Sequence, residues 1–117
     1  MVGVAVYYLF IHEPTQVQDI RGKWQVEFHQ GNFTMVALFS GTLSAGMVSI
    51  LDGFLEGEAG TYQVSGNQVS FDIPTRSAYY VYKYQGHFDT PDSLSGTYYV
   101  ETDSPGAHSD FTAVRIE

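Results

Sequence analysis

The sequence predicts an all-β domain, a small antiparallel up-and-down β-barrel of about eight or nine strands. Short stretches alternate between apolar and polar residues with the period of two that marks a strand covering a core. Turns rich in glycine, proline, asparagine and aspartate separate these stretches, and no segment of ten residues has a convincing 3.6-residue apolar period. Closure into a barrel is favoured over an open sheet because it removes exposed strand edges.

The first part of the chain contains five expected strands. Val4–His12 is rich in β-branched and aromatic residues and ends before Pro14, which lacks the donor that a strand ladder needs. The clearest alternation follows, where Trp24, Val26 and Phe28 share one face of a strand. The other strands expected here are Phe33–Ser40, Thr42–Ile50 and a long Phe54–Val64, in which Gly57 and Gly60 are expected to mark bulges or bends.

The second part of the chain contains four more expected strands, one of them rich in tyrosine. Tyr80, Tyr82 and Tyr84 share one face of that strand, whereas Lys83 lies on the opposite face. The sequence leaves open which face points into the barrel. The four strands are Val69–Ile73, Ala78–Phe88, Leu94–Glu101 and Phe111–Ile116.

All 117 residues are expected to form one domain, because a chain of this length supports a single core. Residues 1–13 are expected to add an extra strand before the main barrel. That strand either helps to close the barrel or pairs with a second copy of the chain, which would make a homodimer.

The charge of the chain excludes some partners. Thirteen acidic residues against five basic ones give a net charge of −8, and five scattered cations cannot form the basic stripe that nucleic acid requires. An anionic membrane surface is disfavoured for the same reason, and the absence of cysteine excludes disulfides and thiolate metal sites.

The apolar start, Val2–Ile11, lacks the flanks of a leader and is too short to span a bilayer as a helix. The compartment stays open between the cytoplasm and export with a leader removed.

A family resemblance rests on three features. Gly22-Lys23-Trp24 at the start of a strand, the glycine-punctuated strands and Arg115 on the last strand resemble the lipocalin and wider calycin superfamily. The resemblance implies that Trp24 and Arg115 pack together as a structural plug at one end of a calycin-like barrel. The chain is shorter than a typical lipocalin, lacks the C-terminal helix and carries an extra apolar strand before the motif.

The candidate ligand-binding residues are mostly aromatic. Tyrosine offers a broad apolar ring with a polar tip, which suits recognition of sugars, aromatic ligands or protein partners. If the tyrosine face points outward, Lys83 points inward and meets an acidic ligand. The predicted ligand-binding residues are Phe28, Phe71, Tyr80, Tyr82, Tyr84, Lys83 and Tyr98.

No motif predicts catalysis, a metal or a cofactor. The four histidines, His12, His29, His87 and His108, show no ligand-pair spacing and are expected on the surface, with His108 the nearest candidate for a haem ligand. The carboxylates are expected to be solvated. They include Glu56 and Glu58 on one strand face, Asp89 and Asp92 in one turn, and the calcium candidates Glu101, Asp103 and Asp110.

These observations favour non-catalytic binding of a small apolar or aromatic ligand inside the barrel. Walls and floor would come from Trp24, Val26, Phe28, Val69, Phe71 and Ile73. One alternative is a solid-core interaction module or homodimer that docks through the N-terminal strand and the tyrosine face. The third reading is a barrel enzyme of the isomerase or cyclase type. A barrel of about eight strands is either filled by side chains or holds one small ligand.

Overall fold

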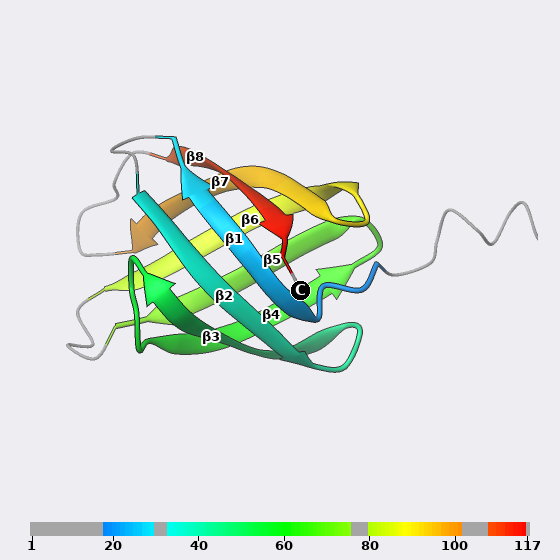
Figure 1. Ribbon diagram of the computed structural model, residues 1–117, viewed down its shortest axis with the longest axis horizontal. Coiled ribbons are helices and arrows are strands. Elements are labelled where there is room, and N and C mark those ends of the chain that lie inside the picture. The colour runs from blue at the N-terminus through cyan, green and yellow to red at the C-terminus, as the bar shows by residue number, and fades with distance from the viewer. Residues whose placement is uncertain (1–17, 30–32, 76–79, 102–107, 117) are drawn as a thin grey trace, which may run out of the picture.

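The chain forms a closed barrel of eight antiparallel strands, which confirms the predicted fold class (Figure 1). The computed structural model describes residues 18–29, 33–75, 80–101 and 108–116. No helix in these ranges is long and apolar enough to cross a membrane. The strands are β1 (Gly22–Phe28), β2 (Phe33–Gly41), β3 (Ala45–Gly53), β4 (Ala59–Ser65), β5 (Gln68–Pro74), β6 (Val81–Thr90), β7 (Ser93–Glu101) and β8 (Ser109–Arg115).

Each strand pairs with the next in sequence, and β1 pairs with β8 to close the sheet. At this seam Trp24 lies opposite Arg115, and Phe28 lies opposite Phe111. The expected strand Val4–His12 lies outside the described residues, so its place in a barrel or a dimer stays a prediction. The described strands close the barrel without it.

The core follows from the alternation that the sequence shows. Every strand sends alternate side chains inward, and the buried residues form one continuous cluster. On β6 the inward side chains include Tyr84, which is fully buried, and the partly buried Tyr82. Lys83 lies on the outer surface, where it pairs with Asp72 and Glu101. The register in which the tyrosines point outward and Lys83 points inward is therefore wrong.

Two glycines make room for a large ring in this core. Gly86 on β6 lies opposite Gly96 on β7. A Cβ on Gly96 would lie 2.1 Å from the Gln85 carbonyl oxygen, and one on Gly86 would lie 3.2 Å from the ring of Phe111. These two positions keep the sheet close-packed around Phe111, which is buried.

The expected long strand Phe54–Val64 is wrong in its first half. β3 continues to Gly53, a turn follows at residues 54–57, and β4 begins only at Ala59. Gly53 and Gly57 have φ values of 82° and 86°, a left-handed backbone that suits glycine and turns the chain. Glu56 therefore lies in a turn, so it does not share a strand face with Glu58. The register shifts occur instead between Val36 and Ala37, and between Phe88 and Thr90.

Arg115 seals the end of the barrel where β1 begins and β8 ends. Its guanidinium carbon lies 4.6 Å from the centroid of the buried Trp24 ring, and the indole N–H donates to the Ile20 carbonyl at 2.7 Å. The guanidinium also donates to the carbonyls of Asp19, Arg21 and Pro91 and to the Asp92 carboxylate. One side chain thus joins β8, the entry segment at residues 18–21 and the β6–β7 turn. These three segments meet at the same end of the barrel (Figure 1). We call this end the plugged end.

Replacing Arg115 tests the importance of this contact. Arg115→Lys keeps the charge but not the planar set of donors, so we expect the free energy of unfolding to fall by about 2 kcal/mol. Arg115→Met, which removes every donor, is expected to cost about 3 kcal/mol. Urea denaturation of the purified variants measures both values.

Arg21→Lys is the matched control. Arg21 pairs with Asp19 at 2.9 Å on an exposed surface, and such pairs contribute little. We expect Arg21→Lys to leave the free energy of unfolding essentially unchanged. Equal stabilities of Arg115→Lys and Arg21→Lys would contradict a special role for Arg115.

Candidate functional site

The end of the barrel opposite Arg115, which we call the far end, is lined by aromatic rings. β1 ends there, β2 and β6 begin there, and the turn at residues 54–57 crosses it (Figure 1). Strands β1, β6 and β7 send rings inward near this end, the turn adds Phe54, and Phe33, which is half-exposed, begins β2. We define the far-end cluster as Phe28, Phe33, Phe54, Tyr82, Tyr84 and Tyr98.

The rings of this cluster contact one another in a continuous array. Phe54 stacks on Phe33 with centroids 5.6 Å apart and meets Phe28 and Tyr82 edge to face, each at 5.3 Å. Tyr98 meets Phe28 edge to face at 4.9 Å. Such stacked and edge-to-face contacts are the favoured geometries of aromatic pairs. Phe54, Tyr82 and Tyr98 are only partly buried, so the array is accessible from its outer side.

Tyr84 lies beneath this array and is the most unusual residue in the barrel. Its ring stacks on Phe71 at 4.4 Å and on Tyr98 at 5.4 Å, and none of its surface is exposed. Its buried hydroxyl has no hydrogen-bond partner among the described residues. Burial raises the pKa of the Tyr84 phenol, and the nearby Tyr98 and Tyr82 phenols raise that pKa further. The hydroxyl is therefore neutral, buried and close to two other tyrosines.

The other buried tyrosine provides a contrast. Tyr62 on β4 is also fully buried, and burial raises its pKa. Its hydroxyl, however, donates to the Thr42 carbonyl at 2.6 Å. The Tyr62 phenol near the plugged end is therefore hydrogen-bonded, whereas the Tyr84 phenol near the far end has no partner among the described residues.

The structure brings some of the predicted binding residues together and separates others. Phe28, Tyr82, Tyr84 and Tyr98 meet in the far-end cluster, and Phe71 packs beneath them. Tyr80 precedes β6 and is 48% exposed. Lys83 faces outward, where Asp72 at 3.6 Å and Glu101 at 3.5 Å raise its pKa, with Asp72 the larger cause.

Phe33 and Phe54 belong to the far-end cluster but are not among the binding residues predicted from the sequence. Phe33 begins β2 directly after a predicted turn, and Phe54 follows Asp52-Gly53, which the sequence marks as a turn. Because residues 54–57 were predicted to be a strand, the position of Phe54 directly after a turn was not recognised. An aromatic residue directly after a turn at a barrel end is placed to cover that end.

The described residues contain no group of three metal-ligating side chains. His29 is exposed, as predicted, and His87 lies on the outer face beside Asp89 at 3.1 Å. His108 is exposed and stacks on Tyr99 at 4.6 Å, outside the barrel interior where a haem would lie. His12 and Asp103 lie outside the described residues.

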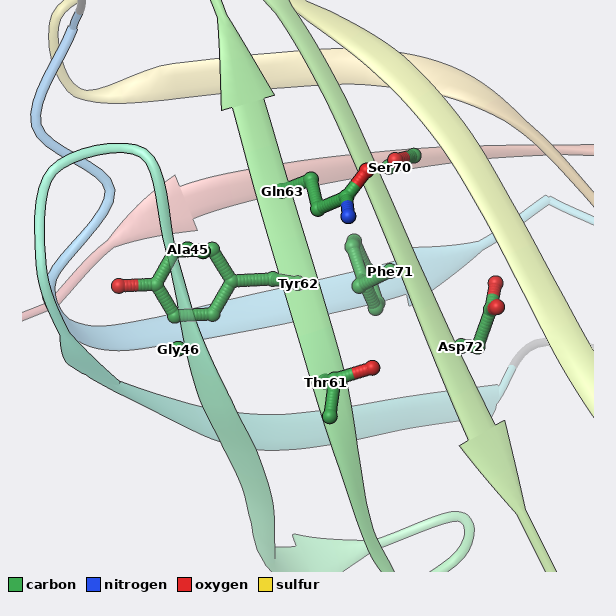
Figure 2. Close-up of a pocket in the computed structure, with 8 residues that line it drawn as sticks. All are labelled: Ala45, Gly46, Thr61, Tyr62, Gln63, Ser70, Phe71 and Asp72. Atoms are coloured by element: carbon green, nitrogen blue, oxygen red, sulfur yellow. The ribbon is translucent and has the colours of Figure 1, made fainter.

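Three hollows lined by described residues open on the outer surface of the sheet. One, of about 390 Å³, spans β3 to β5, where Thr61, Gln63, Ser70 and Asp72 project from the sheet (Figure 2). A second, of about 270 Å³, adjoins it along β4 to β6 and shares Gln63 and Ser70. The third, of about 390 Å³, crosses β7 and β8 beside Gly96. These grooves lie on the outer surface of the sheet, apart from the aromatic array at the far end.

Comparisons with known proteins support the fold. No protein-family model matches the sequence, and no curated protein matches it. A solved structure of EF1p2_mFAP2b bound to DFHBI is similar, with a TM-score of 0.62 and 17% sequence identity. The similarity covers 83% of this chain and 94% of that chain. At this level of identity the likeness establishes a shared barrel architecture.

Removing the Tyr84 hydroxyl should make the protein more stable. A buried hydroxyl without a partner costs about 1–3 kcal/mol, so we expect Tyr84→Phe to raise the free energy of unfolding by about 1 kcal/mol. Tyr62→Phe is the matched control, because it removes a hydroxyl that is hydrogen-bonded. That variant should lose about 1 kcal/mol. Urea denaturation near pH 7 measures both, and a destabilised Tyr84→Phe would show that the hydroxyl has a partner.

The raised pKa of Tyr84 also predicts an alkaline effect. An unfolded tyrosine loses its proton near pH 10, whereas the buried Tyr84 keeps its proton to a higher pH. Its contribution to stability is thus complete below about pH 10 and is lost as the pH rises further. Between about pH 10 and 11 this tyrosine should cost the wild type about 1 kcal/mol that Tyr84→Phe does not lose. Denaturation midpoints at both pH values test this, and parallel losses would contradict it.

Proposed function

We propose that the protein binds a small planar aromatic ligand at the far end of the barrel without catalysing a reaction. In this proposal the ligand lies against Phe54, Tyr82 and Tyr98 and forms a hydrogen bond with the Tyr84 hydroxyl. The observation that carries the proposal is the buried Tyr84 hydroxyl with no partner among the described residues. Buried polar groups in proteins are nearly always paired, so an unpaired one at a barrel end points to a ligand.

The chemistry of the far end suits an aromatic ligand. Small-molecule sites are mostly apolar and carry a few polar groups that fix the ligand's orientation. The partly buried rings of Phe54, Tyr82 and Tyr98 supply the apolar walls. A planar ligand can add further stacked and edge-to-face contacts to the array, each worth about 0.5–1.5 kcal/mol beyond its burial.

The protonation state of Tyr84 favours binding over catalysis. Its raised pKa keeps the phenol neutral, so the hydroxyl can donate or accept a hydrogen bond. A tyrosine that acts as a base would need the opposite shift, toward neutral pH.

The structural neighbour supports the proposal at the level of architecture alone. EF1p2_mFAP2b, whose fold is similar, holds DFHBI. Four predicted binding residues fall outside the proposed contact set. Lys83 faces outward and Tyr80 is half-exposed ahead of β6, whereas Phe28 and Phe71 are buried in the core behind the contact residues. The predicted docking through an outward tyrosine face is not retained, since Tyr82 and Tyr84 point inward.

A fluorescence titration with 6-propionyl-2-(dimethylamino)naphthalene tests the proposal. This neutral dye has a carbonyl acceptor, and its emission shifts to the blue in apolar surroundings. We expect saturable binding to the wild-type protein and a Kd that is about fivefold higher for Tyr84→Phe, because one hydrogen bond is lost. Phe54→Ala, which removes a wall of the site, is expected to weaken binding about tenfold.

Tyr99→Phe is the matched control for the titration. Tyr99 follows Tyr98 on β7 and stacks on His108 outside the barrel, so the control removes a hydroxyl from the opposite face of the same strand. Its Kd should equal that of the wild type. Because Tyr84→Phe is expected to be the more stable protein, its weaker binding cannot be assigned to unfolding. Equal affinities of the wild type and Tyr84→Phe would overturn the proposed site.

A further inference from the structure

The charges of the barrel are distributed unequally between its two ends. Among the residues that the structure describes, the plugged half carries three carboxylates and three cations. Among the same described residues, the far half carries seven carboxylates and a single cation, Lys83. The far-half carboxylates are Glu27, Asp52, Glu56, Glu58, Asp72, Glu101 and Asp110.

The ion pairs deepen this asymmetry. At the plugged end Arg21 pairs with Asp19 at 2.9 Å, and Arg115 pairs with Asp92 at 2.8 Å. In the far half Lys83 lies between two carboxylates, at 3.6 Å and 3.5 Å. Its charge is thus already offset, and the described surface around the far-end cluster has a negative potential.

The interior of the far end is also electron-rich. Aromatic rings carry negative charge on their faces, and a phenol oxygen that has no donor to accept from presents free lone pairs. Tyr84 supplies such an oxygen, fully buried and close to the phenols of Tyr82 and Tyr98. This second observation is independent of the surface carboxylates and points to a ligand on the same side of the molecule.

We infer that the ligand of the far end is an organic cation, an ammonium or similar group carried on an aromatic body. The inference rests on the proposed aromatic site and specifies the charge of its ligand. Ring faces attract a desolvated cation, as in the aromatic cages that hold quaternary ammonium groups. The surrounding carboxylates draw a cation toward the site and repel an anion. An amine of this kind can also donate an N–H to the Tyr84 oxygen.

Two isosteric probes separate charge from shape. Phenyltrimethylammonium and tert-butylbenzene differ in one atom, a cationic nitrogen in place of a carbon. Each probe is titrated against the bound naphthalene dye, so that competition reports the binding of both probes at the same site. We expect the cation to bind at least about fivefold more tightly at low salt, and benzenesulfonate to show no binding. The higher affinity of phenyltrimethylammonium relative to tert-butylbenzene should decrease as the salt concentration is raised, because salt screens the surface carboxylates.

A charge variant with a matched control locates the effect. Glu56→Gln together with Glu101→Gln removes two far-half charges, and we expect about a threefold weaker affinity for phenyltrimethylammonium. Affinity for tert-butylbenzene should not change. Asp89→Asn removes one charge at the plugged end, where Asp89 pairs with His87, and should leave both affinities unchanged.

The outcomes distinguish this inference from the proposed function. Equal or stronger binding of tert-butylbenzene, with dye binding still dependent on Tyr84, would overturn the cation preference and keep the aromatic site. Failure of phenyltrimethylammonium to displace the bound dye would also overturn the preference. Loss of dye binding altogether would overturn the proposed function itself.

Discussion

The contact between Arg115 and Trp24 fixes the frame on which the rest of the barrel depends. The two residues face each other across the β1–β8 seam, where the first and last strands close the sheet. The guanidinium covers the indole and binds carbonyls from residues 18–21 and from the β6–β7 turn. Because these groups are far apart in sequence, one planar cation with several donors holds them more effectively than a set of separate contacts.

Sealing one end in this way makes the two ends of the barrel chemically different. Near the plugged end the buried polar groups are paired, including the Trp24 indole and the Tyr62 hydroxyl. The far end is held by contacts between rings, and the Tyr84 hydroxyl beneath them has no partner in the part of the chain that the structure describes.

The sequence predicts the fold well because strand periodicity is a local property. The alternation of Trp24, Val26 and Phe28 reports which residues face a core before any pairing is known. The plug was also predictable, from the Gly22-Lys23-Trp24 motif together with Arg115, and the structure shows the expected contact. The fold prediction needed only residue type and order along the chain, whereas the expected Trp24–Arg115 contact came from a family resemblance.

The candidate site was less predictable because it depends on pairing between strands. In the Ala78–Phe88 segment both faces carry aromatic or aliphatic groups, so periodicity alone cannot say which face is inward. The pairing of β6 with β5 and β7 decides it, placing Tyr84 opposite Phe71 and Tyr98. That the Tyr84 hydroxyl has no partner among the described residues is harder still to predict, because it depends on the positions of all the atoms around that oxygen.

The far end, which contains the unpaired Tyr84 hydroxyl, also contains a residue with an unfavourable backbone conformation. Leu55, in the turn that carries Phe54, has a φ of 66°, and no other described non-glycine residue has a positive φ. This conformation costs an L-residue about 1–2 kcal/mol. Leu55 nevertheless packs against the core, as Phe54 does, so the strained turn presses two apolar side chains onto the barrel end.

Strain and an unpaired buried group are both destabilising, and unfavourable features of this kind concentrate at functional sites. Here both lie at the end opposite the plug, where the carboxylates also gather. Neither cost is required by the fold. Phenylalanine at position 84 would avoid the unpaired hydroxyl, and glycine at position 55 would relieve the strain in the turn. Their coincidence at one end supports the proposal that a ligand binds at this end of the barrel.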